Sequence, residues 1–245
     1  MRPSPIYVPS PEAEDERRLN RERERLVNER KQHHSRIQGL LKLHGTDFSG
    51  SVGLLRLTTL VDWAGNPLPP RLSRELEREQ QRWRLIDEQL KAVDREINAA
   101  RRQGSSPICE KARRLESLKG IGHVGSWSLS CELFGWRAFA NRRQVGAASG
   151  LVSVPYSTGG SHRDQGISKA GPGRLRALLI ELAWGWLRFQ PTSDLARWYE
   201  KRYAKQGKRM RRIGIVALAR RLSIALWRYV EFGEVPAGAL LKTAT

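Results

Sequence analysis

The spacing of apolar residues predicts two long helices in the first 105 residues. The second is the clearer, because its apolar positions alternate at intervals of four and three for nearly four heptads, with Glu79 in the one polar slot. These positions are Leu72, Leu76, Trp83, Ile86, Leu90, Val93 and Ile97. The first helix is expected to start at Ser10, ahead of Pro11 and acidic residues, and to end at Gly45. Residues 46–70 predict a connection, since they mix Gly, Asp, Asn and Pro with a short apolar patch.

The surfaces of both helices are charged. Acidic residues and arginine alternate from Glu12 to Lys31, which indicates a solvated helix with many i,i+4 pairs. The run Ser-Ser-Pro at 105–107 breaks the second helix. Two long charged helices joined by a loop predict either an antiparallel hairpin or a dimerising coiled coil, with a purely structural spacer as the alternative. We therefore expect a helical coiled-coil region over residues 1–105 and a homo-oligomer formed through it.

The second part of the chain, residues 106–245, predicts a compact basic helical domain. Its helical patterns end in a tail that we expect to fray from Glu234 onward. The fold class is all-α, and any strands should be short pieces near residues 150–168. The helical patterns cover residues 112–136, 141–150, 169–189 and about 212–230.

The chain is strongly basic, with 44 Lys and Arg against 25 Asp and Glu, a net charge of +19 and a pI near 10.9. Such an excess favours a polyanionic partner, most simply nucleic acid, although ribosomal or membrane-surface binding fits the charge equally well. No apolar run approaches the roughly 18 residues of a membrane span. Cys109 and Cys131 form no C-x-x-C pair, which favours a reducing cytoplasm. His33 and His34 are adjacent, and we interpret them as solvated rather than metal-binding.

Residues 150–176 gather the chemistry of the chain around one turn. Ser157 and Thr158 precede two glycines, Gly159 and Gly160, and Pro155 and the glycines predict that Ser157 lies on a loop. A helix is expected from Ser168, where backbone N–H groups favour an anion. A hydroxyl in this setting could attack or hold a phosphodiester, and a polar surface loop is the alternative. The candidate phosphate contacts are Arg163, Lys169, Arg174 and Arg176.

Neither of the polar residues nearest the serine, His162 and Asp164, is established as its base by sequence proximity.

Two further segments suit nucleic acid. Residues 112–136 read as helix, glycine turn and helix, which resembles a helix-hairpin-helix module that grips phosphate through Lys119, Gly120, Gly122 and Gly125. A tight turn between helices that needs glycine is the alternative. Residues 201–212 hold seven cations and no acid. The aromatic residues Trp198, Tyr199 and Tyr203 interleave with the start of that run, which suits backbone contact and base stacking or, alternatively, a solvated helix end.

An ordered string of motifs resembles the C-terminal domain of serine-using insertion-sequence transposases of the IS116/IS110/IS902 type. The string reads GL-x-P, S-x-G, then I-[ST]-K-x-G-x-x-x-[LV]-R, and here it runs from Gly150 to Arg176. With the upstream run LKGIGHVGSWSLSCELFGWRAFANRRQ, roughly 80 residues match. The resemblance implies that Ser157 is the nucleophile of a DNA recombinase, with Thr158 the less favoured candidate.

The same resemblance implies parts beyond this chain. Full-length relatives carry a preceding RuvC-like domain whose four acidic residues hold a divalent metal such as Mg²⁺, and they use an element-encoded guide RNA. Residues 6–10 resemble the segment that follows the last of those acids, and no part of that domain is legible here. We expect a truncated or split gene product or a partner domain elsewhere, and Met1 is not established as the true start. The alternatives are a catalytically inactive nucleic-acid-binding remnant and a basic scaffold for other polyanions.

Overall fold

The computed structural model describes residues 8–48, 50–158 and 161–242, and between residues 155 and 165 it describes the backbone alone. These residues form helices and one two-stranded sheet, which confirms the all-α class. The chain divides into two units, described separately below. One holds Arg18–Ala99, and the other holds the described residues up to Arg17 together with those from Ala100 onward.

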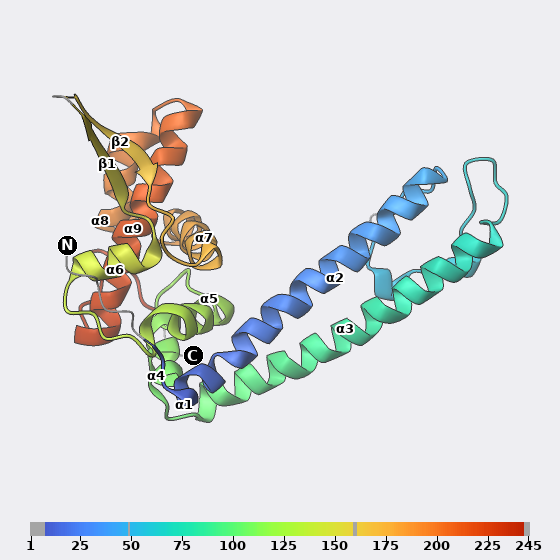
Figure 1. Cartoon of the computed structure of the whole chain (residues 1–245), viewed down its shortest axis with the longest axis horizontal. Coiled ribbons are helices and arrows are strands. Elements are labelled where there is room, and N and C mark those ends of the chain that lie inside the picture. The colour runs from blue at the N-terminus through green and yellow to red at the C-terminus, as the bar shows by residue number, and fades with distance from the viewer. Residues whose placement is uncertain (1–7, 49, 159–160, 243–245) are drawn as a thin grey trace. The chain divides into compact units, whose positions relative to one another are not determined.

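The first unit is an antiparallel helical hairpin (Figure 1), made of α2 (Arg18–Leu43) and most of α3 (Pro70–Gln103). Two short 3₁₀ turns, Val52–Leu54 and Leu57–Thr59, interrupt the predicted connection. The far end of the hairpin is closed by an apolar cluster that joins both helices to the connection, and its members are Ile37, Leu41, Val52, Leu55, Leu68, Leu72 and Leu76. The heptad positions of α3 that are buried confirm the seam read from the sequence.

The middle of this hairpin is held by ion pairs between its helices. Glu79 occupies the polar slot of the seam, and its buried carboxylate contacts His33 at 2.6 Å and Arg36 at 3.1 Å. Burial alone would raise the pKa of the Glu79 carboxyl, but the hydrogen bonds and charges of His33 and Arg36 outweigh it and lower the pKa. The prediction that His33 is solvated is therefore wrong, because this imidazole is drawn into the seam by Glu79. Two more pairs, Arg23–Asp94 and Arg30–Asp87, continue the same antiparallel register.

The first predicted helix is two helices. Ser10 caps it as expected, since its Oγ accepts from the N–H of Ala13, but α1 (Pro11–Glu16) ends before Arg17. The break coincides with the side chain of Arg17, which is buried and ion-paired with Glu132. A continuous solvated helix would leave that guanidinium in water, so the expectation of a single helix is wrong at this point.

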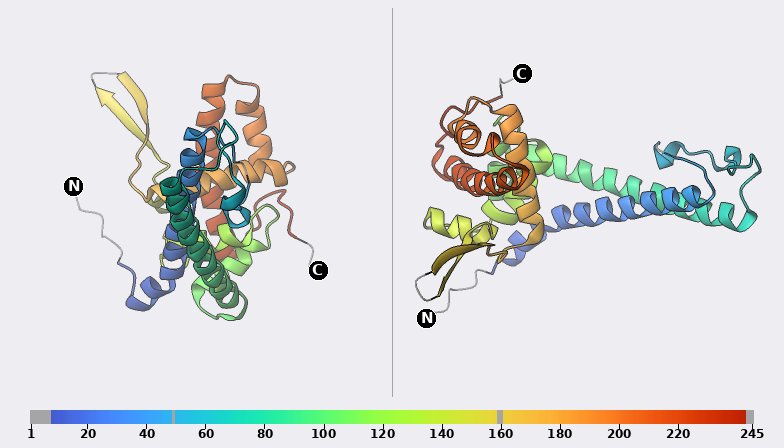
Figure 2. Two further views of the ribbon diagram at one scale, coloured as in Figure 1. Left: turned by 90° about the vertical axis from the view of Figure 1, so that its right-hand side faces the viewer. Right: turned by 90° about the horizontal axis from the view of Figure 1, so that it is seen from above.

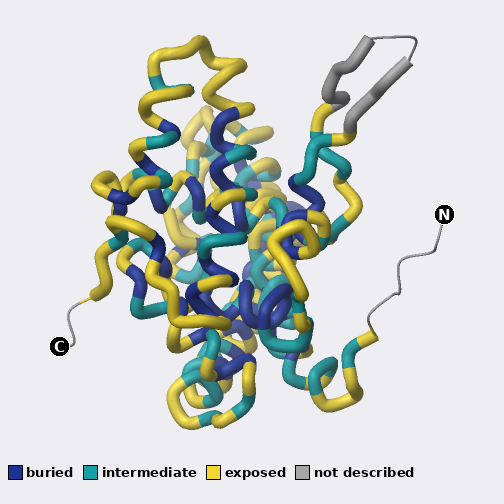
Figure 3. Tube along the Cα trace, turned by 90° about the vertical axis from the view of Figure 1, so that its left-hand side faces the viewer, coloured by how far each residue is buried: buried dark blue, intermediate teal, exposed yellow. Residues whose placement is uncertain are grey.

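The second unit packs its helices around α9 (Lys208–Phe232), which contacts α4 (Pro107–Glu116), α6 (Arg142–Ser149), α7 (Gly173–Phe189) and α8 (Asp194–Tyr199). Figure 3 shows the buried positions gathered where these helices meet. Helix α5 (His123–Leu129) runs on into a π-helical turn at Ser130–Phe134, and α8 runs on into another at Glu200–Ala204. The largest fully buried side chains of this core include Trp186, Phe134, Leu115, Leu129 and Leu175.

Helix α7 begins later than the sequence pattern suggests. Its expected start at Ser168 is wrong, because Lys169 adopts a left-handed conformation with a φ of 55° and Pro172 caps the helix. A residue in that conformation cannot continue a right-handed helix. Helix α9 conversely begins at Lys208, some four residues earlier than expected.

The short strands expected near residues 150–168 are present as a β-hairpin. Strand β1 (Ser153–Thr158) pairs antiparallel with β2 (Ser161–Ile167), and the pair projects from the helices of its unit (Figure 2). Ser157 lies in β1, directly opposite His162 in the register. The prediction that Ser157 lies outside a helix is therefore confirmed. Ser157 lies in a strand, however, and not in the loop that we expected.

The tail after Glu234 is docked rather than frayed. Leu241 forms a β-bridge with Leu118, and the Lys119 N–H donates to the Leu240 carbonyl at 3.0 Å. The buried Gln190 amide holds both partners, since its Nε2 donates to the carbonyls of Lys119 and Leu240 and its Oε1 accepts from the Leu240 N–H. The expectation of fraying is wrong because these backbone groups find partners within the fold. No helix of the described residues is long and apolar enough to cross a membrane.

Candidate nucleic-acid interface

Three motif residues that flank the hairpin, Gly150, Gly171 and Arg176, hold its base in a fixed conformation, and we call this set the lock. Gly150 ends α6 with a φ of 65°, and its carbonyl accepts from the Lys169 N–H at 3.2 Å. A Cβ on Gly150 would lie 2.8 Å from the Gly171 nitrogen, and one on Gly171 would overlap the Ala148 carbonyl, so both positions require glycine. The two chain segments leading into and out of the hairpin are thus packed backbone against backbone.

Arg176 completes this lock. Its guanidinium donates to the carbonyls of Lys169, at 3.1 Å, and Gly171, which fixes the turn that follows β2. The Ser168 N–H donates to the Val152 carbonyl at 2.8 Å on the other side. Of the predicted phosphate contacts, Arg176 is therefore engaged with backbone, whereas the Lys169 side chain is exposed.

Three further residues were predicted beside the serine, namely Gly159, Gly160 and Arg163. Gly159 and Gly160 lie outside the described residues. The backbone of Arg163 lies in β2, opposite Tyr156. What is described is the fixed base of the hairpin and the register position of Ser157.

Arg174 stands at the start of α7 but faces a buried carboxylate. The side chain of Glu132 is only 3% exposed and contacts Arg174 at 3.1 Å and Arg17 at 3.2 Å. The indole of Trp136 contacts two guanidinium groups, those of Arg17 at 4.4 Å and Arg137 at 4.3 Å from its ring centre. Burial, with the nearby charge of Arg17, lowers the pKa of Arg137. This cluster ties α1 to the start of α7.

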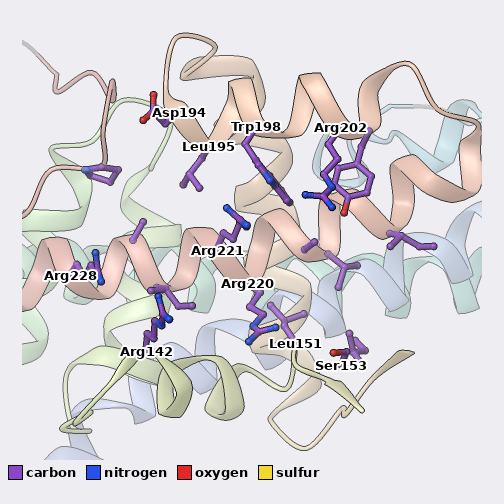
Figure 4. Close-up of a pocket in the computed structure, with 18 of the residues that line it drawn as sticks. Arg142, Leu151, Ser153, Asp194, Leu195, Trp198, Arg202, Arg220, Arg221 and Arg228 are labelled. Atoms are coloured by element: carbon purple, nitrogen blue, oxygen red, sulfur yellow. The ribbon is translucent and has the colours of Figure 1, made fainter. Parts of the chain in front are cut away.

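A basic groove of about 1380 Å³ extends along α9 from the base of the hairpin (Figure 4). Helix α6 and the hairpin base form one wall, and α8, the π-helical turn after it and the first residues of the tail form the other. Two acids, Asp194 and Glu234, are among its described lining residues, and both have arginine partners, Arg197 and Arg228. The cations that line the groove are all arginines: Arg142, Arg143, Arg202, Arg209, Arg220, Arg221 and Arg228.

The floor of the groove, along α9, carries apolar side chains as well as arginines, and α8 adds one tryptophan at its edge. Ile213, Val216 and Ile224 of α9 lie along it and are at least partly exposed. The Arg221 guanidinium lies over the Trp198 ring at 4.1 Å from its centre, and Tyr203 meets the same ring edge-on at 5.4 Å. The groove thus combines arginines with partly exposed apolar and aromatic surface, the pairing of features that nucleic-acid grooves use.

The basic run at 201–212 contributes less than the sequence suggested. Arg202 and Arg209 line the groove, and Trp198 lines it as well. Tyr199 is buried in the core, where burial raises the pKa of its hydroxyl. Tyr203 packs against Gly214. Two of the three aromatic residues therefore also serve packing.

The groove also contains arginines that the sequence reading passed over, on α6 and on the outer face of α9. The sequence did indicate that three of these arginines are exposed, namely Arg220, Arg221 and Arg228. They fall outside the expected core face of the last helix, which consists of Val216, Ala219, Leu222, Leu226 and Tyr229. Their convergence with Arg142 depends on tertiary packing.

The segment predicted as a helix-hairpin-helix module consists of α4, a turn and α5. The turn includes Gly120, with a φ of 88°, and Gly122 is the N-cap residue of α5. The Lys119 side chain is exposed, but its N–H is taken by the tail. A Cβ on Gly125 would lie 3.1 Å from Leu182, so this glycine lets α5 approach α7 and follows, rather than opens, the start of α5 at His123. Phosphate binding here stays a prediction.

A metal site is not formed by the described residues, in which no three His, Cys, Asp or Glu side chains come together. The Cys131 thiol is buried next to Glu132, and burial raises its pKa well above the ordinary value, so it stays protonated.

Comparison with known protein families finds a match to the family described as Transposase IS116/IS110/IS902, over residues 112–199. The chain is similar to the putative transposase y4rJ of Sinorhizobium fredii, with 44% identity over 97% of this chain and 63% of the relative. It is 30% identical to the transposase for insertion sequence element IS1328 of Yersinia enterocolitica, over 96% of this chain and 69% of the relative. A probable family 20 transposase of Pseudomonas aeruginosa is 31% identical over 92% and 67%. The chain thus spans about two thirds of the length of these relatives.

Proposed function

This chain belongs to the IS116/IS110/IS902 family of transposases, and from that premise we propose that it binds DNA and acts in DNA transposition as a recombinase whose nucleophile is Ser157. The observation that carries the proposal is the placement of Ser157 on a hairpin whose base is locked by Gly150, Gly171 and Arg176. The groove of arginines begins at that same base, where Ser153 and Ile167 line it.

The proposed reaction is attack of the Ser157 hydroxyl on a DNA phosphodiester. A bond forms between its Oγ and the phosphorus, and the bond from phosphorus to one sugar oxygen breaks. The hydroxyl loses its proton to a base, and the departing sugar oxygen takes up a proton. The phosphoserine diester conserves the energy of the broken bond for rejoining to another strand.

The groove's arginines would hold the strand on either side of the attacked phosphate. A locked hairpin base favours this chemistry, because a nucleophile is useful only if it is held at a fixed position relative to the phosphate. Lys169, exposed beside the lock, and Arg163 on β2 are the closest candidates for phosphate contacts near the serine. The turn with Lys119 and Gly122 is proposed to grip a phosphate farther along the duplex through the free N–H groups of the first turn of α5.

Three further parts of the proposal concern partners. A divalent metal such as Mg²⁺, held by the acidic domain that precedes this region in relatives, would supply charge stabilisation at the phosphate. An element-encoded RNA would select the DNA sites. The helical hairpin of residues 18–99 would join copies of the chain, and the exposed Trp63 near its tip offers an apolar contact.

The decisive experiment traps a covalent protein–DNA adduct on a nicked element-end DNA, with RNA, Mg²⁺ and the acidic domain supplied. We expect an adduct with the unchanged chain and with Thr158→Ala, and none with Ser157→Ala, while DNA binding stays intact in all three. An adduct that persists in Ser157→Ala would refute the assignment of the nucleophile.

A second candidate is favoured by the arginines of the groove and the net charge of +19, which suit binding without catalysis. It is a nucleic-acid-binding remnant of the same family that holds DNA without cutting it. Tight binding with a steep salt dependence and no adduct, with or without the acidic domain, would support this candidate over the recombinase.

A further inference from the structure

We infer that the groove along α9 holds a single, unpaired DNA strand, with phosphates on its arginines and bases on the apolar side chains exposed along α9. The inference rests on the proposed function for the identity of the polymer, because the groove begins at the base of the hairpin that carries Ser157. It adds which state of the DNA is bound there and by which residues.

The charge of the groove demands a polyanion. Seven arginines line it, and the two acids among its described lining residues, Asp194 and Glu234, already pair with arginine. From Arg209 to Arg228 the cations extend along α9 for about 28 Å at roughly 1.5 Å per residue. A polymer with evenly spaced negative charges matches this length, whereas a small anion would occupy one end of it.

The apolar side chains on the floor of the groove favour a single strand over a duplex. A duplex presents phosphates and sugars on its outside and keeps its base faces stacked inside, so it would leave Ile213, Val216 and Ile224 uncovered. An unpaired strand exposes its base faces, which gain free energy by leaving water for an apolar surface. Ile213 is 47% exposed in the structure. An exposed apolar stripe interspersed with arginines therefore suits an unpaired strand.

Trp198 and Arg221 form the specific contact for a base. The Arg221 guanidinium lies 4.1 Å from the centre of the Trp198 ring, and both side chains line the groove (Figure 4). A planar guanidinium stacked on an indole leaves its other face open to a third flat group, and nucleobases stack on guanidinium planes as they do on aromatic rings. Trp198 would thus act by holding Arg221 flat, and Arg221 would take the base.

The test measures binding of the full chain to fluorescein-labelled 15-nucleotide single-stranded DNA of unstructured sequence, by anisotropy at several salt concentrations. The comparison probes are a 15-base-pair duplex and a single-stranded RNA of the same sequence. We expect the single DNA strand to bind at least about 10-fold more tightly than the duplex and the RNA. Trp198→Ala should weaken single-strand binding roughly 5- to 150-fold, the range for loss of one stacked base.

Arg221→Lys is the sharper variant, because it keeps the charge but removes the flat group. It should weaken binding without changing the slope of log affinity against log salt. Arg220→Gln should instead lower the magnitude of that slope by about 0.7, the value for one phosphate contact on a single strand. The matched control is Arg188→Gln, an exposed arginine of α7 outside the groove, which should bind like the unchanged chain.

Equal or tighter binding of the duplex would overturn the inference, as would unchanged affinity in both Trp198→Ala and Arg221→Lys. Equal or tighter binding of the RNA would overturn the assignment to DNA. These results are independent of the covalent adduct. A strand preference without any serine adduct would count against the proposed nucleophile alone, and an adduct without strand preference would count against this inference alone.

Discussion

The carboxylate of Glu132 should be among the most sensitive single groups in the C-terminal unit. Its side chain is 3% exposed and is shared by Arg17, itself 7% exposed at the side chain, and Arg174, which is 34% exposed. Glu132→Gln keeps the shape but removes the charge, so the buried Arg17 guanidinium loses its main counter-charge. Breaking a buried pair by removing one partner costs about 3–5 kcal/mol.

We place the expected loss in unfolding free energy at about 3 kcal/mol, the lower end of that range. Arg17 keeps a second partner in Glu14, at 2.8 Å, and Arg174 can turn toward water. Glu14→Gln is the matched control, because that carboxylate is 31% exposed and lies on the rim of the same cluster. It should cost no more than about 1 kcal/mol, as partly exposed pairs do.

The assay is urea unfolding followed by tryptophan fluorescence, to which Trp136 contributes from its contacts with Arg17 and Arg137. A loss below about 1 kcal/mol in Glu132→Gln would refute the reasoning, since the cluster would then be solvated. The same variants also separate two roles of Arg174. If this arginine chiefly balances Glu132, Arg174→Gln should lower stability by more than it lowers DNA affinity.

Three further outcomes follow from the fold. Gly171→Ala should lower the melting temperature and destabilise the chain by about 2 kcal/mol or more, because the new Cβ overlaps the Ala148 carbonyl. Gly173→Ala should not, because its Cβ would make only an ordinary contact with the Arg176 side chain, at 3.6 Å. The pKa of the Glu79 carboxyl is lowered, so the stability that this group contributes is complete above about pH 4.5, its ordinary value, and is lost as the pH falls further. Urea unfolding at several pH values should show a smaller loss of stability at acid pH in Glu79→Gln than in the unchanged chain. Gln190→Ala removes three hydrogen bonds and should release the tail, with a loss of about 2–3 kcal/mol in unfolding free energy. Amide hydrogen exchange at the tail should then become faster, and unchanged exchange would contradict this expectation.

The helices were predictable because their signals are local. The seam of α3 repeats every three to four residues, and Ser10 caps a helix that begins with proline, so each of these elements is specified within a few residues of itself. The turn at Gly120 was predictable for the same reason.

What the sequence did not reveal depends on contacts between distant residues. The break after α1 follows from the contact of Arg17 with Glu132, which lies 115 residues further along the chain. His33 was misassigned because its partner Glu79 is 46 residues away and on another helix. Composition and local pattern carry no record of such pairings, so a charged residue reads as solvated wherever its partner is remote.

The same distinction between local and long-range signals applies to the candidate site. The motif string located the serine and its flanking glycines, and the structure explains Gly150, Gly171 and Arg176 of that string as the lock of the hairpin base. The groove was only half visible, because its arginines come from α6, from the turn after α8 and from α9, and only the run at 201–212 stood out as a cluster.

The docked tail has a consequence for how the protein forms during synthesis. The Lys242 ammonium donates to the Ile121 carbonyl, 121 residues earlier in the chain. The turn around Gly120 therefore cannot make this contact until the ribosome has synthesised the intervening residues. At about 5–20 residues per second, the wait is roughly 6–24 s. The helical hairpin of residues 18–99 needs only its own contacts and can fold while the ribosome is still working. The nascent chain should therefore acquire its hairpin first and close its basic unit only after residue 242 has emerged.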